Sequence, residues 1–277
     1  MMRNIFRFFY RNMLPLRVRN SLDLFEELRQ SSFDAPMHAG ENDLNEKNIL
    51  VLSPHPDDDV IGCGGTLHIY HRRGARITIV YMTDGRKGNP KYDENSLVVQ
   101  RREEARKATA VIGIDNLIFL DNKDTELSAT PKTIKELQDI LHKVKPEAVF
   151  LPFLLDNHPD HRATNDIFVK ASFKYKAPLT CYGYEIWTPI STPNYAVNIT
   201  DQIEVKKQSI EQHHSQTELC PINDCMSGLC KYRSLPYNLK DVYAEAFFQC
   251  SLSEYRYLWK IADFTYHSNT GGLQWKT

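Results

Sequence analysis

The chain has 277 residues, enough for one large domain or two small ones. Its composition, 42% hydrophobic and 25% charged, is ordinary for a globular protein, and a formal net charge of −1 gives no global field that would recruit nucleic acid. No run of about 18 apolar residues is present, so no membrane-spanning helix is predicted.

The first twenty residues, MMRNIFRFFYRNMLPLRVRN, carry five arginines and no acid. No small-residue cleavage site follows them, so a secretory signal is not expected. Residues 1–20 form either a helix that docks on the protein's own body or on a second subunit, which we favour, or an amphipathic helix on an anionic membrane surface. Six cysteines in a chain of this length indicate reduced thiols in a cytoplasmic protein, and the membrane alternative for residues 1–20 would make it membrane-peripheral.

The domain organisation follows from where the regular pattern begins. Residues 1–46 are predicted to be a lead-in, and 47–277 a single domain with a C-terminal extension. Apolar strands are predicted at 48–54, 75–85, 116–122 and 147–156, and helices at 59–74, 96–113, 131–146 and 162–176. This alternation is typical of an α/β fold with a mostly parallel sheet covered on both faces.

Beyond residue 180 the pattern is less regular. Residues 181–187 and 194–200 are predicted to be strands, 201–216 a helix, and the remainder short helical pieces such as 241–251. No linker separates this part from the rest, so it is either a cap or an extension of the same domain.

Two clusters of polar residues follow predicted strands. LSPHPDDDVIGCGG spans residues 52–65, and DNHPDHRATN spans 156–165. Since sites in parallel sheets lie beyond the carboxyl ends of the strands, both clusters are expected in one crevice. Together they supply His55, Asp57, Asp58, His158, Asp160 and His161.

Two imidazoles and a carboxylate with an open fourth position are typical of catalytic zinc, which lowers the pKa of bound water toward about 7. A second aspartate beside the metal can then act as general base. Asp59 falls in the first turn of the next helix, where the helix dipole favours an anion. Asp-rich turns also bind magnesium, and the same donor set can hold iron(II) or cobalt.

The glycines at 62, 64 and 65 lack the spacing of the dinucleotide-binding fingerprint. We favour close packing of helix on strand as their role. A phosphate-cradling role is the alternative, and it supports a rival function, a nucleotide-binding module or transferase.

The chain contains five motifs in a fixed order: HPDD, a GCGGT run, TDG, R-x-x-E and HPDH. This order resembles the pattern of the PIG-L/LmbE-type zinc deacetylases over roughly residues 47–250. The resemblance implies a Rossmann-like three-layer sandwich. It also implies removal of an N-acetyl group from an N-acetylglucosamine-type sugar or sugar conjugate in glycan or glycoconjugate biosynthesis, with a small-molecule substrate or a lipid- or nucleotide-linked one. A zinc amidohydrolase of the same fold acting on a non-sugar amide is the first rival, and a catalytically silent scaffold is another.

The resemblance further implies roles for the residues of the two clusters. It implies zinc ligation by His55, Asp58 and His161, proton abstraction by Asp57, oxyanion stabilisation or amine protonation by His158, and orientation of His158 by Asp160. The substrate-contacting arginine of the family falls at Arg101, with Arg102 as the neighbouring alternative. Asp59 departs from the glutamate that many members carry.

Weaker candidates follow the second and third predicted strands. Asp84, Arg86 and Asp124 are hypothetical substrate contacts, although an aspartate before a glycine is as often structural. His213 either reaches the site from its helix or, as we favour, is an exposed helix histidine. Trp187 is either a sugar-stacking residue or, as we favour, part of the core. Cys220, Cys225 and Cys230 lack the spacing of a structural zinc site.

Overall fold

The computed structural model describes residues 16–34, 44–235 and 242–267. The strands are β1 (Asn48–Ser53), β2 (Arg76–Thr83), β3 (Leu117–Asn122), β4 (Ala148–Pro152), β5 (Thr180–Tyr184), β6 (Tyr195–Asn198) and β7 (Ala244–Ser251). The helices are α2 (Leu16–Asp34), α3 (Asp58–Arg72), α4 (Glu94–Val111), α5 (Pro131–Val144), α6 (Pro159–Ser172), η2 (Thr200–Gln202), α7 (Ile203–Glu211), α8 (His214–Thr217), α9 (Ile222–Arg233) and α10 (Leu252–His267).

The strands form one seven-stranded sheet in the order β3-β2-β1-β4-β5-β7-β6. The first five pair in parallel, and β7 runs antiparallel to both β5 and β6. The central strands are buried along almost their whole length, as expected for a parallel sheet covered on both faces.

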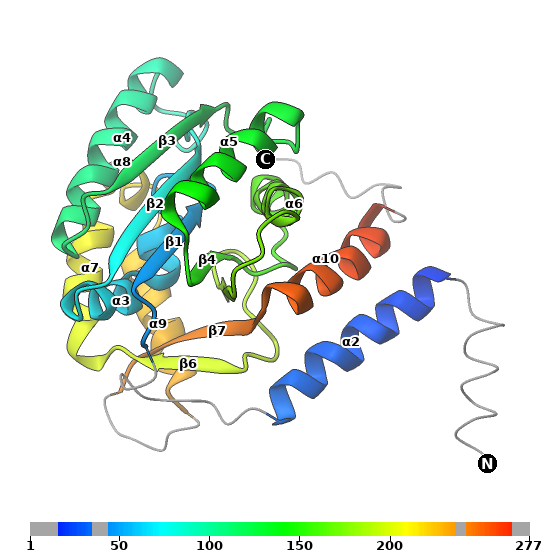
Figure 1. The fold of residues 1–277 in the computed structure, drawn as a ribbon. Helices are drawn as coiled ribbons and strands as arrows, with labels where there is room; N and C mark the ends of the chain where they lie inside the picture. The colour runs from blue at the N-terminus through cyan, green and yellow to red at the C-terminus, as the bar shows by residue number, and fades with distance from the viewer. Residues whose placement is uncertain (1–15, 35–43, 236–241, 268–277) are drawn as a thin grey trace, which may run out of the picture.

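Alternate residues of each strand contribute to opposite halves of the core. Leu50 and Leu52 face a cluster with α2, α5, α6 and α10, whereas Ile49 and Val51 face one with α3, α4, α7 and α9. Figure 1 shows the two sets of helices on the two sides of the sheet. The fold is therefore the three-layer α/β sandwich that the sequence predicts.

The segment 241–251 corrects one prediction, because most of it is a strand, β7, and not a helical piece. Its alanines and glutamate favour a helix locally, but the segment pairs with β5 on one side and β6 on the other. Most of its side chains are buried. Tertiary pairing therefore outweighs local propensity here.

The predicted lead-in also contains more structure than expected, because residues 16–34 form helix α2. Leu24 and Leu28 are buried in the same cluster as Leu258 and Trp259 of α10. Residues 16–34 therefore dock on the protein's own body. Most of residues 1–20 lie outside the described residues. Among the helices described, none is both long and apolar enough to cross a bilayer.

Helix α3 is interrupted at Cys63, whose φ of −145° and ψ of 17° are not helical. A break leaves carbonyl oxygens on one side and N–H groups on the other without helical partners. Lys206 Nζ donates to the carbonyl oxygen of Ile61 at 2.7 Å, and the Glu245 carboxylate accepts the N–H groups of residues 65 and 66 at 2.9 and 2.7 Å. The two buried side chains pair at 2.6 Å. We call the Lys206–Glu245 pair the helix splice.

The glycines of α3 serve close packing, as the sequence indicates. A Cβ at Gly62 would lie 2.5 Å from the ring of Tyr184, and one at Gly65 would lie 2.9 Å from Ile199. Since Glu245 already accepts the N–H of Gly65, this segment offers no free backbone cradle for a phosphate. The nucleotide-binding reading of the glycine cluster is therefore not supported.

Candidate metal and catalytic site

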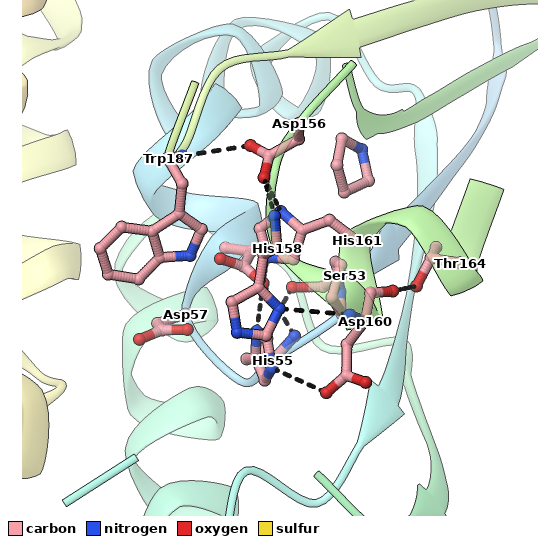
Figure 2. Close-up of polar contacts among 12 residues, drawn as sticks. Ser53, His55, Asp57, Asp156, His158, Asp160, His161, Thr164 and Trp187 are labelled. Carbon is pink, nitrogen blue, oxygen red and sulfur yellow. Dashed lines mark hydrogen bonds and ion pairs between the residues drawn. The ribbon is translucent and has the colours of Figure 1, made fainter. Parts of the chain in front are cut away.

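The two predicted clusters meet at the carboxyl ends of adjacent strands. β1 and β4 are neighbours, and the chain continues from β1 to β2 on one side and from β4 to β5 on the other. This reversal of strand order is where α/β sheets place their ligands. His55 follows β1, while His158 and His161 follow β4, and Figure 2 shows these side chains converging.

Asp58 bridges the two clusters. One of its carboxylate oxygens, Oδ2, lies 3.0 Å from Nδ1 of His55 and 3.2 Å from Nε2 of His161. Two ligand atoms about 2.0–2.2 Å from one zinc ion at tetrahedral angles are separated by roughly 3.3 Å, so these spacings suit a shared ion. The structure brings together the three side chains that the sequence predicts to be metal ligands.

The second ring nitrogen of each histidine faces a different carboxylate. Nε2 of His55 lies 3.3 Å from both Asp124 and Asp160, and Nδ1 of His161 lies 3.4 Å from Asp156. Histidines that bind metals usually donate their other N–H to a carboxylate, which fixes the tautomer. Nδ1 of His55 and Nε2 of His161 both face Oδ2 of Asp58, and these are the atoms that would hold a metal.

Asp160 requires a correction, because its carboxylate does not orient His158. It lies beside His55 and accepts the N–H groups of Thr125 and Leu127 at 2.7 and 3.3 Å. Its contact with His158 is through the backbone, whose N–H donates to Nδ1 of His158 at 3.2 Å. The H-P-D-H spacing places Asp160 in the first turn of α6, where the side chain faces the loop after β3.

The electrostatics of the cluster favour a cation. Burial alone would lower the pKa of His55, but Asp58, Asp124 and Asp160 raise it well above its usual value. Burial likewise opposes the charge on His161, yet Asp58 and Asp156 raise its pKa to about 9. Both histidines thus hold protons to offset surrounding carboxylates, a role that a divalent cation can take instead.

The donor set passes a second test of fit. Neither ring nitrogen of His161, although buried, has a hydrogen bond of acceptable geometry to the described residues. Buried polar atoms without partners are rare and often mark an ion site. One nitrogen each from His55, His158 and His161 lie within 4.8 Å of one another, so His158 offers a further nearby donor.

His158 begins helix α6. It is the N-cap, followed by Pro159 at the first helical position, a favourable start for a helix. Because Nδ1 accepts the N–H of Asp160, the neutral ring carries its proton on Nε2. Burial, and then the charges of His55 and His161, lower the pKa of His158. The side chain is thus set up as a neutral N–H donor.

Asp57 is paired with Arg101. An oxygen of Asp57 lies 3.0 Å from the guanidinium of Arg101, which is 2% exposed and also donates to the carbonyl oxygen of Gly85 at 3.0 Å. Burial raises the pKa of Asp57, while the Arg101 charge lowers it. Arg101 therefore contacts Asp57, and its burial leaves little surface for the substrate contact expected of it. The alternative, Arg102, pairs with Asp121.

Asp59 is hydrogen-bonded to Ser53 and Tyr81. It accepts hydrogen bonds from the hydroxyls of Ser53 and Tyr81 at 3.2 and 3.1 Å, and its own N–H donates to Ser53 at 3.1 Å. Burial raises its pKa to about 7. Asp59 therefore fixes the turn between β1 and α3.

The weaker candidates lie near the site but have internal partners. Asp84 accepts two side-chain hydrogen bonds from Arg86, at 2.9 and 2.5 Å, and the N–H of Asp124. Asp124 faces His55 and accepts the N–H of Lys87 at 3.0 Å. These contacts favour a positioning role for both aspartates over the predicted role in substrate binding, whereas Arg86 is partly exposed.

Three residues lie where the sequence does not predict them or have a role that it does not predict. Asp156 is part of the second cluster and has no predicted role, although an acid at the end of a strand is a usable signal. His213 is 1% exposed, not on the surface, and burial followed by the Arg101 charge lowers its pKa to about 3. Trp187 is exposed, not in the core, and its ring lies beside His158.

Comparison with known proteins places this geometry in context. Residues 50–172 match the family described as PIG-L, GlcNAc-PI de-N-acetylase. A diacetylchitobiose deacetylase of Thermococcus kodakarensis is 29% identical over 67% of this chain and 75% of the relative. A probable N-acetyl-alpha-D-glucosaminyl L-malate deacetylase 2 of Bacillus anthracis is 28% identical over 62% and 82%.

Solved structures give the same picture. The N,N'-diacetylchitobiose deacetylase of Pyrococcus horikoshii, complexed with its inhibitor MPG, superposes with a TM-score of 0.70 and 26% identity, covering 85% of this chain and 94% of that one. Its coverage extends well beyond residues 50–172, so the similarity includes the antiparallel end of the sheet or the flanking helices.

Proposed function

We propose that the chain, which resembles the PIG-L/LmbE-type deacetylases, is a metal-dependent hydrolase that removes the acetyl group from an N-acetylglucosamine-type amino sugar or conjugate. The relatives named above act, by their names, on diacetylchitobiose and on an N-acetylglucosaminyl malate. Their common feature is an acetamido sugar, which defines the substrate class.

One observation carries the proposal: Asp57, held by Arg101, stands next to an Asp58 that bridges His55 and His161. Hydrolysis of an amide needs a base for the attacking water, stabilisation of the oxyanion and a proton for the leaving amine. The described site contains a candidate for each task within a few residues.

His55, Asp58 and His161 would hold the metal, for which we propose zinc on the basis of the two-imidazole, one-carboxylate donor set. When bound, such an ion polarises the amide carbonyl and makes water more acidic. Asp124 and Asp160 face Nε2 of His55, and Asp156 lies 3.4 Å from Nδ1 of His161, so these carboxylates would orient the two rings.

Asp57 would accept the proton of the attacking water. Its ion pair with Arg101 fixes the carboxylate and favours its charged form, which is the form that acts as a base. As the tetrahedral intermediate collapses, the same carboxyl can give its proton to the amine nitrogen, so that the C–N bond breaks with a neutral amine as the leaving group.

His158 would stabilise the developing oxyanion through Nε2–H, because its Nδ1 is already bonded to the backbone. A neutral donor suits this task, and the lowered pKa keeps the ring neutral. This geometry favours oxyanion stabilisation over protonation of the amine, the other role considered for His158.

The test is acetate release from N-acetylglucosamine, N,N'-diacetylchitobiose and acyclic amides by protein of measured metal content, with and without chelator. We expect chelator-sensitive release from the sugars, at about one metal ion per chain. Asp57→Ala should retain the ion and lose about 10²–10⁴-fold in kcat.

Two outcomes would contradict the proposal in different ways. Release from acyclic amides alone would identify an amidohydrolase of another substrate class. Full activity of metal-free protein, or of Asp57→Ala, would remove the mechanism itself.

A further inference from the structure

Trp187 leaves most of its indole in solvent beside the catalytic residues. Trp187 is 66% exposed, and the centre of its ring lies 6.4 Å from that of His158, with 23° between the ring planes. Figure 2 shows the indole next to His158 and on the same side as Asp57. Scattered exposed apolar residues are common, so exposure alone assigns no role.

The backbone that carries this indole is fixed to the site. The N–H groups of Trp187 and Thr188 donate to Oδ2 of Asp156 at 3.2 and 3.3 Å. The other oxygen of Asp156 accepts the N–H of His158 at 2.9 Å and lies 3.4 Å from His161. One buried carboxylate thus sets both the histidines and the position of the tryptophan.

A second anchor closes the loop from the other side. Glu185 accepts the N–H of Ile190 at 2.6 Å, and Arg233 of α9 binds both the Glu185 carboxylate and the carbonyl oxygen of Ile190. The loop after β5 is therefore held by buried polar contacts and not by burial of the indole. Ordering the backbone while exposing the ring is what a pre-organised contact surface requires.

We propose that the indole of Trp187 is a stacking platform for the pyranose ring that carries the reacting acetamido group. This inference rests on the proposed function and adds a determinant of specificity to it. The C–H face of a pyranose is flat and apolar, so covering it with the indole removes apolar area from water on both partners. An acyclic amide has no such face and gains little from the contact.

The experiment compares Trp187→Ala and Trp187→Phe with wild type on N-acetylglucosamine and on N-acetylethanolamine, an acyclic acetamide. For the sugar, Trp187→Ala should raise KM about tenfold, with kcat changed less than about twofold, and Trp187→Phe should fall between. The kcat/KM for N-acetylethanolamine should not change. Phe173→Ala, at an exposed aromatic beyond the other end of α6, is the matched control.

An unchanged KM for the sugar, or equal losses on both substrates, would overturn the platform. Binding separates this result from failure of the proposed function. N-acetylglucosamine is titrated into Asp57→Ala protein and into Asp57→Ala/Trp187→Phe protein while tryptophan fluorescence is followed. Saturable quenching that Trp187→Phe removes supports the platform even if wild type releases no acetate. Absence of saturable sugar binding overturns it.

Discussion

Arg101 shows how a single residue takes a role that its sequence position does not reveal. Its place in Q-R-R-E-E-A fits a surface helix, yet the guanidinium is buried against Asp57, 44 positions earlier. The family resemblance predicts a substrate contact for Arg101, whereas the structure shows it paired with Asp57, and Arg102 pairs with Asp121. No periodicity argument could supply the partner, because the contact depends on how α4 packs beside the turn after β1.

Replacing Arg101 by methionine should therefore lower kcat about 10²-fold while the metal content stays near wild type, since Asp57 loses the group that fixes its position. Arg101→Lys should recover part of the loss, because the charge remains but one of the two contacts is lost. The measurement is steady-state kinetics beside metal analysis. Arg102→Met is the control, and an equal loss in it would contradict the assignment.

His213 gives a prediction for the pH dependence of stability. Its folded pKa of about 3 lies below the ordinary value of 6.5, so between these values the unfolded chain binds more protons. Stability should therefore fall as pH falls from about 6.5 toward 3, by up to roughly 1.4 kcal/mol per pH unit from this group.

The check is urea unfolding of His213→Leu at several pH values. The free energy of unfolding of this variant should fall less steeply below pH 6.5 than that of wild type. His214→Leu, at the exposed neighbouring residue, should follow wild type. A His213→Leu protein as acid-sensitive as wild type would show that other groups account for the slope.

Among the elements, α3 combines a predictable part with an unpredictable one. The helix, its start after HPDD and the packing role of its glycines follow from local sequence. Its break and the splice do not, because Lys206 and Glu245 lie on α7 and β7, 145 and 180 residues from the atoms they satisfy. Long-range pairing also explains why β7 is a strand although its local sequence predicts a helix.

The splice should show strong energetic coupling. Lys206→Met or Glu245→Gln alone leaves a buried group without its partner and should cost about 3–5 kcal/mol in the free energy of unfolding. The double variant should lose clearly less than the sum, by about 1–3 kcal/mol. Urea unfolding measures this cycle.

The exposed ion pair Lys135–Asp139 on α5 provides the matched cycle. Its side chains are 66% and 64% exposed, and its coupling should stay below about 0.5 kcal/mol. If the two losses at the splice add up, the coupling is as small as in the exposed pair. The buried pair then does not hold the broken helix.

At the scale of the whole molecule, the alternation of strands and helices was enough to predict the architecture and the place of the site. The predicted order of elements through residue 176 needs only small shifts of their ends. Right-handed parallel connections and the reversal between β1 and β4 then bring His55 and His161 together. The carboxylates and the arginine beside the site residues needed the structure, because Asp124 follows β3 and Arg101 lies on α4, far along the chain from His55 and Asp57.

Metal should stabilise the molecule as a whole, because it joins segments that follow β1 and β4. At a free zinc concentration of 100 times Kd, binding adds about 2.7 kcal/mol, or roughly 5–10 °C in Tm for a chain of this size. Thermal unfolding with zinc and with chelator measures the shift. His161→Ala should abolish it, whereas His142→Ala, at an exposed histidine of α5, should keep it. Equal shifts in both variants would place the stabilising ion elsewhere.

The splice also has a consequence for the order of events during synthesis. The ribosome produces the metal-binding turns early, but Glu245 emerges only near the end of the described chain. Until β7 enters the sheet, the second half of α3 starts with uncapped N–H groups, and closing so long a loop is slow. A nascent or truncated chain that stops before β7 should therefore contain all the proposed ligands, but α3, which carries Asp58, should be incompletely held. Metal capture then becomes a late, post-translational step.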